Sequence, residues 1–288
     1  MIGVAGPGQI TAGKGSLTTA RLLTGRLTTP VPSVLEITDK GPAATKLNHL
    51  LLADLRRRSR AARRPGAPLA MSVLSLIRRQ VALRIISAMR RLGHGGTILL
   101  IPPARSRGRQ AHPERLRIRY CFAADESRRR LRTLVLGLLQ ALSEDCAARF
   151  DPGHRVTWKD YLASTHPGVR QMDHSIDDMA RQVAFLSAVD GAVVIQQPLE
   201  LLGFGAEISG HLPDVEYVAR ALDPYIKRTE IESALGVGTR HRSAYRFCNA
   251  TPGAAAVVVS QDGSVRLMSK LGKYVVYSEH LGSGALHH

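Results

Sequence analysis

The chain has 288 residues, of which 44% are hydrophobic and 22% are charged, so it can bury a full core as one large domain or two small ones. No apolar run reaches the ~18 residues that a membrane-spanning helix needs and no signal-peptide core is present, which together predict a cytoplasmic protein without a membrane partner. The net charge of +17 is uneven: residues 1–150 hold 27 Lys and Arg against 8 Asp and Glu, whereas residues 151–288 hold 13 against 15.

The basic first half indicates a partner with negative charge. Its arginines gather in three runs, RRRSRAARR (56–64), RSRGR (105–109) and RRRLR (128–132). Such runs neutralise phosphates in nucleic-acid complexes, but they also form the solvated faces of ordinary helices. Because aromatic residues make up 5% of the chain, stacking platforms for single strands are few. A nucleic-acid partner and a merely solvated surface both stay open.

The cysteines and histidines predict neither a disulfide framework nor a cysteine zinc site. Cys121, Cys146 and Cys248 lie far apart without a CxxC pair, and the 11 histidines show no HExxH spacing. Free thiols are typical of a reducing cytoplasm.

The first predicted elements follow a flexible N-terminal segment, residues 1–33, which is rich in Gly, Thr and Pro and has no stable hydrophobic period. Helices and strands are then predicted in the order helix, helix, strand, strand, helix, at residues 45–58, 71–92, 97–101, 115–123 and 126–148. The helix at 71–92 has the strongest signal, because its apolar residues recur along one stripe. Residues 151–168, with two prolines and the single tryptophan, predict a surface excursion.

In the second half, helices alternate with apolar strands. The predicted elements are a helix at 171–187, a buried strand that begins at or just after Asp190, a helical patch at 214–222, and strands at 254–260, 264–269 and 273–278. This order predicts an α/β fold, a three-layer domain in which helices flank a central mixed, largely buried β-sheet.

Asp190 begins the first of these strands and precedes two small residues, Gly191 and Ala192, which leave space above the backbone. A carboxylate at such a place can hold a divalent metal or orient an attacking hydroxyl. An Asp-Gly pair is also an ordinary turn, so this position alone leaves both functions open.

A second polar cluster lies in the stretch GTRHRSAYRF (238–247). Its first residues are Gly238, Thr239, Arg240, His241 and Arg242. Guanidinium groups beside a hydroxyl and free backbone N–H groups bind polyanions such as nucleotide phosphates, although a solvated basic turn at a helix start has the same composition. With the carboxylate at Asp190, the cluster provides both halves of phosphoryl-transfer chemistry.

These stretches resemble a known family. DGAVVI (190–195) and GTRHRSA (238–244) are similar to the DGA and RHR motifs of the diadenylate cyclase domain, found in the DNA-integrity-scanning cyclases and the membrane-bound bacterial cyclases. RIISAMRRLGHGGTILLI (84–101) is similar to the helix and strand that open that domain. AAAVVVSQDGSVR (254–266) resembles its closing strand and Ser-acidic-Gly turn.

The resemblance implies how the chain is divided. A diadenylate cyclase-like domain would cover residues 34–278, with an insertion at about 104–170 that the usual domain lacks. The flexible segment 1–33 would precede it and a tail, residues 279–288, would follow it.

The resemblance also implies an activity, the condensation of two ATP molecules into cyclic di-AMP with release of pyrophosphate. Each protomer of a face-to-face homodimer would bind one ATP. Asp190 would bind Mg²⁺ or Mn²⁺ and help to activate the 3′-hydroxyl, while Gly191 and Ala192 would line the nucleotide. Gly238, Thr239, Arg240, His241 and Arg242 would hold the phosphates, with Ser260 nearby and Asp262 as a second metal ligand.

Two departures from the family pattern favour an alternative. Many members carry His where this chain has Val189, and two acidic residues where it has Gln261 and Asp262. Fewer metal ligands suit a divergent, sensor-type member that binds a nucleotide in a bacterial signalling or defence system without turning it over. The sequence therefore predicts a cyclase, with a catalytically silent nucleotide sensor as the alternative.

Overall fold

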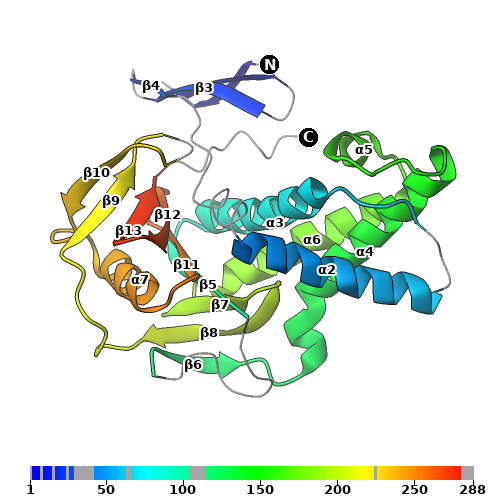
Figure 1. Cartoon of the computed structure of the whole chain (residues 1–288). Helices are drawn as coiled ribbons and strands as arrows, with labels where there is room; N and C mark the ends of the chain where they lie inside the picture. The colour runs from blue at the N-terminus through cyan, green and yellow to red at the C-terminus, as the bar shows by residue number, and fades with distance from the viewer. Residues whose placement is uncertain are drawn as a thin grey trace.

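The protein is described by a computed structural model (Figure 1). It describes the backbone of four strands within residues 2–28 and then residues 42–62, 66–103, 114–223 and 226–279, with side chains from residue 45 onward. The four strands are β1 (Ile2–Gly6), β2 (Gln9–Lys14), β3 (Leu17–Leu23) and β4 (Arg26–Thr28). They pair in order as an antiparallel sheet, where the sequence predicts a flexible segment.

A nine-stranded mixed sheet forms the centre of the remaining chain. Its strands are β5 (Gly96–Ile101), β6 (Leu116–Cys121), β7 (Ala192–Gln196), β8 (Glu200–Ile208), β9 (Tyr217–Ala221), β10 (Thr229–Ser233), β11 (Ala255–Val259), β12 (Val265–Leu271) and β13 (Tyr274–Ser278). The spatial order is β10-β9-β13-β12-β11-β5-β7-β8-β6. β5 pairs with β7 and β13 with β9 in parallel, and the other pairs are antiparallel. The predicted mixed sheet is thus confirmed.

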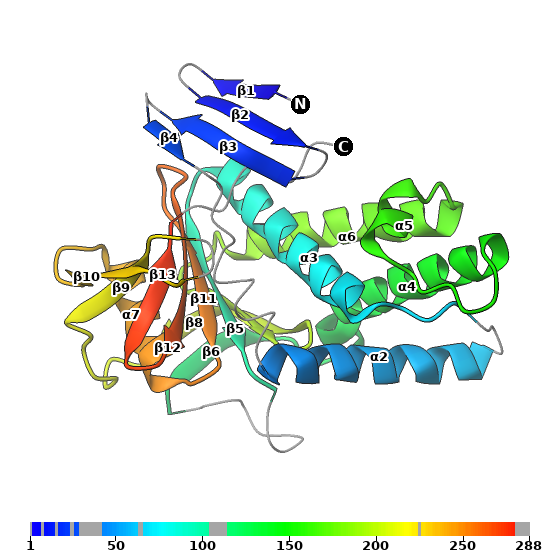
Figure 2. The same cartoon turned by 45° about the horizontal axis from the view of Figure 1, so that its top comes forward.

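One face of this sheet is covered by four long helices (Figures 1 and 2). They are α2 (Pro42–Ala62), α3 (Met71–Leu92), α4 (Asp125–Arg149) and α6 (Pro167–Leu186). The predicted stripe of α3 is buried at Leu74, Ile77, Val81, Ile85 and Met89, which pack with apolar residues from the other three helices. Burial of this stripe drives α3 onto the sheet.

The opposite face carries the short helix α7 (Thr239–Ala250). Side chains alternate between the two faces along each strand, so Val257 of β11 joins the core beneath the long helices and Val258 joins the core beneath α7. Tyr245 and Phe247 of α7 are fully buried in this second core. Helices therefore flank both faces of the sheet, as predicted.

One predicted element was wrong and one strand was missed. Residues 214–222 were expected to include a helix, but residues 217–221 form strand β9, in which Val218 and Ala219 are buried between the hairpin partner β10 and the sequence-distant strand β13. Tertiary pairing overrides the helix propensity of this short segment. The neighbouring strand β10 was not predicted, because its polar sequence TEIES has little apolar content.

The excursion at 151–168 is held firmly by the helical layer. It contains helix α5 (Trp158–Ala163), and Val156 forms a parallel bridge with Leu69. The hydroxyl of Tyr161 donates a hydrogen bond to Asp173 Oδ1 at 2.7 Å, and Arg84 Nη2 donates to the same carboxylate at 2.7 Å. The segment is thereby tied to α3 and α6.

Part of the Arg-rich half forms ion pairs within the fold. Arg132 of α4 contacts Asp54 of α2, and its Nη1 lies 2.8 Å from Glu200 Oε1 of β8. Arg128 and Arg129 also lie within 4 Å of Glu200. The run at 105–109 lies outside the described residues. Among the helices that the structure describes, none has both the length and the apolarity that a membrane crossing requires.

Candidate functional site

The two candidate motifs meet at one end of the central sheet. Thr97 of β5 is in register with Ala192 of the parallel strand β7, and Gly96 is in register with Val259 of the antiparallel strand β11. The starts of β5 and β7 and the end of β11 therefore share one sheet edge. Ser260 directly follows β11, Gly95 directly precedes β5, and Asp190 lies two residues before β7, so all three flank this end of the sheet.

Arg240 brings the basic cluster to the same edge. Its Nη1 lies 3.0 Å from the position that a Cβ atom on Gly95 would take, and the backbone N of Gln261 lies 3.2 Å from that position. Gly95 itself has φ of +68°, a left-handed conformation that favours glycine. The guanidinium therefore reaches from the start of α7 across the end of β11 to the start of β5.

The start of α7 combines positive charge with free backbone donors. Gly238 is the N-cap residue, and the first turn holds Thr239, Arg240, His241 and Arg242 without an acidic residue. Thr239, Arg240 and Arg242 are exposed, whereas His241 is half-buried. The first N–H groups of a helix have no partner within the helix, and the helix dipole adds positive potential there. This helix start can therefore bind an anion.

Burial and a neighbouring cation favour the neutral form of the His241 ring. Burial lowers the pKa of His241, the positive charge of Arg266 lowers it further, and Asp262 and Glu279 act in the opposite direction. Its Nε2 is buried without a hydrogen-bond partner among the described residues. Arg266 is held by Glu279 at 2.7 Å and by the Tyr245 hydroxyl at 3.2 Å.

Asp262 lies in the turn between β11 and β12. Its Oδ1 accepts a hydrogen bond from the backbone N of Ser264 at 2.9 Å, which lowers the pKa of its carboxyl. The same turn is closed by hydrogen bonds from Ser260 N to Ser264 O and from Gly263 N to Ser260 O. Asp262 is exposed, and one of its carboxylate oxygens is engaged by the turn in which it lies. Ser260 is half-buried.

Asp190 is exposed in the turn between α6 and β7. Gly191, with φ of +109°, packs on the backbone of β8, where a Cβ would lie 2.6 Å from the carbonyl carbon of Gly205. A residue with a Cβ atom would not fit there, which explains the glycine after Asp190. Ala192 is 3% exposed and belongs to the core beneath α7. Among the described residues, no group of three metal-ligating side chains includes Asp190 or Asp262.

An exposed aromatic ring near Asp190 was not predicted from the sequence. Tyr120 of β6 is 47% exposed and stacks on Phe204 of β8, with ring centroids 4.9 Å apart. Its ring atoms lie 3.0–3.3 Å from the position that a Cβ atom on Gly205 would take, and the carbonyl O of Asp190 lies 3.5 Å from the same position. The ring is therefore a neighbour of the Asp190 backbone, a proximity created by the bulge between β7 and β8.

Comparison with known proteins adds little to this geometry. No protein-family model and no curated protein matches the chain. Among solved structures, a hypothetical membrane spanning protein from Bacillus cereus aligns over 85% of this chain and 93% of its own, with 15% sequence identity and a TM-score of 0.32. A similarity this low carries no argument about fold or function.

Proposed function

We propose that this chain is a diadenylate cyclase-like domain that condenses two ATP molecules into cyclic di-AMP and releases pyrophosphate. The proposal rests on one observation: Arg240 at the start of α7 reaches Gly95 just before β5, and β5 pairs with β7, which Asp190 precedes by two residues. Asp190 and Arg240, which lie 50 positions apart in sequence, thus flank the starts of two adjacent strands.

The residues at this edge suit a nucleotide triphosphate. Arg240, Arg242 and the N–H groups at the start of α7 would bind the phosphates and stabilise the charge that develops when pyrophosphate leaves. Asp190 would accept hydrogen bonds from the ribose and orient the attacking 3′-hydroxyl. The exposed ring of Tyr120 offers a stacking surface for adenine.

A divalent cation fits this arrangement in a limited way. Mg²⁺ is commonly bound through one or two carboxylates together with substrate phosphates. Asp190 offers an exposed carboxylate at the end of the sheet where β5 and β7 begin. Asp262 would be a weaker ligand, because its Oδ1 already accepts the Ser264 N–H. Bound with ATP, Mg²⁺ or Mn²⁺ would neutralise phosphate charge and acidify the attacking hydroxyl.

The reaction requires two copies of the chain. Each phosphodiester bond of the cyclic product joins the 3′-oxygen of one ATP to the α-phosphorus of the other, so two sites must face each other across a two-fold axis. Bound nucleotides would add negative charge between two basic edges and so favour the encounter.

A nucleotide sensor without turnover is the second candidate. It is favoured by the weak ligand set, with Val189 beside Asp190 and Gln261 beside an Asp262 that is engaged in its own turn. Such a protein would keep the arginine contacts to phosphate and lack catalysis.

Incubation with ATP and Mg²⁺ or Mn²⁺, with mass detection of cyclic di-AMP, distinguishes the two. For a cyclase, we expect product from the unmodified protein and a loss of orders of magnitude in Asp190→Asn, which keeps the shape of the side chain and removes its charge. Nucleotide binding without product would instead support the sensor. A folded protein that neither binds nor converts ATP would overturn both.

A further inference from the structure

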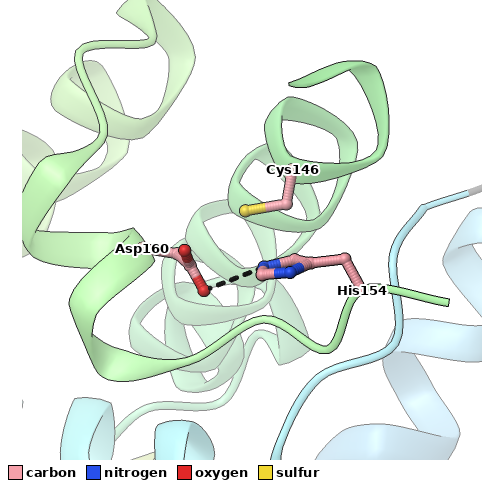
Figure 3. A group of neighbouring side chains, drawn as sticks. All are labelled: Cys146, His154 and Asp160. Carbon is pink, nitrogen blue, oxygen red and sulfur yellow. Dashed lines mark hydrogen bonds and ion pairs between the residues drawn. The ribbon is translucent and has the colours of Figure 1, made fainter. Parts of the chain in front are cut away.

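Three side chains of metal-binding type converge outside the candidate nucleotide site (Figure 3). They are Cys146 in the last turns of α4, His154 in the connection that follows, and Asp160 in α5. One ligand atom from each lies within 4.8 Å of the other two. The thiol residue is buried, and the other two are half-buried. CxxC and HExxH spacing are absent here, which is why the sequence did not predict this group.

Local structure accounts for part of the cluster without an ion. Asp160 Oδ2 accepts hydrogen bonds from the backbone N and the hydroxyl of Thr157, at 2.7 and 2.8 Å, and so caps α5. The ring of His154 lies 3.1 Å from the same oxygen. Capping needs neither a thiol nor an imidazole, and Cys146 is also a fully buried member of the apolar core beneath the long helices.

Nucleophilic catalysis does not explain the thiol either. Cys146 is 0% exposed, so a substrate has no access to its sulfur. Catalytic cysteines lie in partly exposed, electropositive surroundings, whereas this one is a buried residue of α4 that faces the excursion.

We propose that Cys146, His154 and Asp160 bind a zinc ion. Zinc takes thiolate, imidazole and carboxylate ligands in tetrahedral geometry, whereas Mg²⁺ and Ca²⁺ prefer oxygen alone. Two zinc bonds of about 2.0–2.1 Å at a tetrahedral angle place nitrogen and oxygen about 3.3 Å apart. The observed 3.1 Å between His154 Nε2 and Asp160 Oδ2 fits this spacing. A water molecule would complete the four ligands, and the thiol would lose its proton on binding.

Neighbouring groups would hold these ligands in place. Phe150 stacks on the His154 ring with centroids 4.1 Å apart, and Thr157 fixes the Asp160 carboxylate. Such supporting contacts orient metal ligands and raise affinity. The ion would fasten the end of α4 to α5, and so stabilise the excursion against the helical layer.

Zinc titration of the chelator-treated full chain tests this proposal. We expect binding of one zinc ion at this site and a rise in melting temperature, because an ion that binds the folded state stabilises it. Co²⁺ serves as the spectroscopic probe and should give a thiolate-to-metal charge-transfer band. Cys146→Ser should abolish that band, and His154→Gln, a milder change at a half-buried position, should weaken zinc binding by more than about tenfold.

Two variants serve as matched controls. Cys248→Ser removes a thiol that is equally buried but lies in the core beneath α7, and His174→Gln removes an exposed histidine of α6. Both should keep the Co²⁺ band and the zinc affinity of the parent chain. The proposal is overturned if zinc leaves the melting temperature unchanged, or if Cys146→Ser retains the charge-transfer band.

Discussion

Arg240 lies against Gly95: its Nη1 is 3.0 Å from the place where a Cβ on Gly95 would be. The carbonyl O of Val259 is still nearer to that place, at 2.7 Å. A glycine at this position therefore lets a guanidinium from the start of α7 rest over the sheet edge where β5 begins and β11 ends.

Gly95→Ala tests this relationship. The substituted residue would have to keep φ of +68°, which is strained for alanine. Its methyl group would press on the backbone carbonyl of Val259 and on Arg240. Gly93→Ala is the matched control, because Gly93 has φ of +72° but open space around its Cβ position. Urea unfolding should show a free energy of unfolding lower in Gly95→Ala than in Gly93→Ala by about 1–3 kcal/mol. Equal losses in the two variants would show that crowding at Gly95 is negligible.

The phosphate contacts are tested by Arg240→Ala combined with Arg242→Ala. Each charge-assisted contact is worth about 1.5–3 kcal/mol, so calorimetry should show ATP binding weakened by a few kcal/mol. Arg170→Ala removes an exposed arginine at the far end of α6 and should leave the affinity unchanged. Unaltered ATP binding in a folded double variant would show that this stretch is only a solvated basic turn at a helix start.

Tyr120 is expected to stack on the base of the bound nucleotide. Tyr120→Phe keeps the ring and should bind ATP like the parent chain, whereas Tyr120→Ala should lose about 1–3 kcal/mol of binding free energy. Triphosphate without a base should bind the parent chain and Tyr120→Ala equally. If Tyr120→Ala binds ATP with full affinity, the ring has no part in nucleotide recognition.

We expect His241 to make the free energy of unfolding depend on pH. Because its folded-state pKa lies below the ordinary value of 6.5, the unfolded chain takes up the proton first as the pH falls. The stabilisation is complete above about pH 6.5, decreases as the pH falls toward the folded-state pKa, and then stays level. Urea unfolding at pH 7.5 and pH 5.5 should therefore show a smaller loss in His241→Gln than in the parent chain. Identical pH profiles would contradict the assignment.

Arg84 holds a partly buried ion-pair network between α3 and α6. Its side chain is 9% exposed and contacts Asp173 at 2.7 Å and Asp177 at 3.2 Å. Arg84→Met leaves both carboxylates without their cation, at a cost of about 2 kcal/mol after allowance for their partial solvation. The exposed Arg91→Met on the same helix should change stability by less than about 0.5 kcal/mol. Thermal unfolding of the two variants provides the comparison.

Long periodic segments could be predicted from the sequence, because their signal is local. The stripe from Leu74 to Met89 identifies α3 from side-chain spacing alone, and the apolar run at 254–260 identifies β11. Strand β9 could not be identified in this way. Its residues favour a helix locally, and they are extended because Ala219 pairs with Val276, which lies far along the chain.

For the candidate site, the two polar motifs could be predicted from the sequence, but the contacts around them could not. Asp190 and the Thr239–Arg242 cluster could be singled out by composition and by resemblance to a family, and the structure brings both to one edge. The role of Gly95 depends on β11 and α7 arriving beside it, and that of Tyr120 on a bulge in β8. Neither contact leaves a trace in local sequence, because each brings together elements that are distant along the chain.

The parallel pairing of β13 with β9 has a consequence for how the sheet opens. This seam consists of the pairs Val276 with Ala219 and Tyr277 with Arg220, whereas β5 is joined to β7 and to β11 by five pairs on each side. Backbone amides of the β9–β10 hairpin should therefore exchange with deuterium sooner than those of β5, through local opening that leaves the rest of the sheet intact. We expect the edge that carries Asp190 and Ser260 to keep its geometry while the hairpin on the far side of the sheet opens and closes.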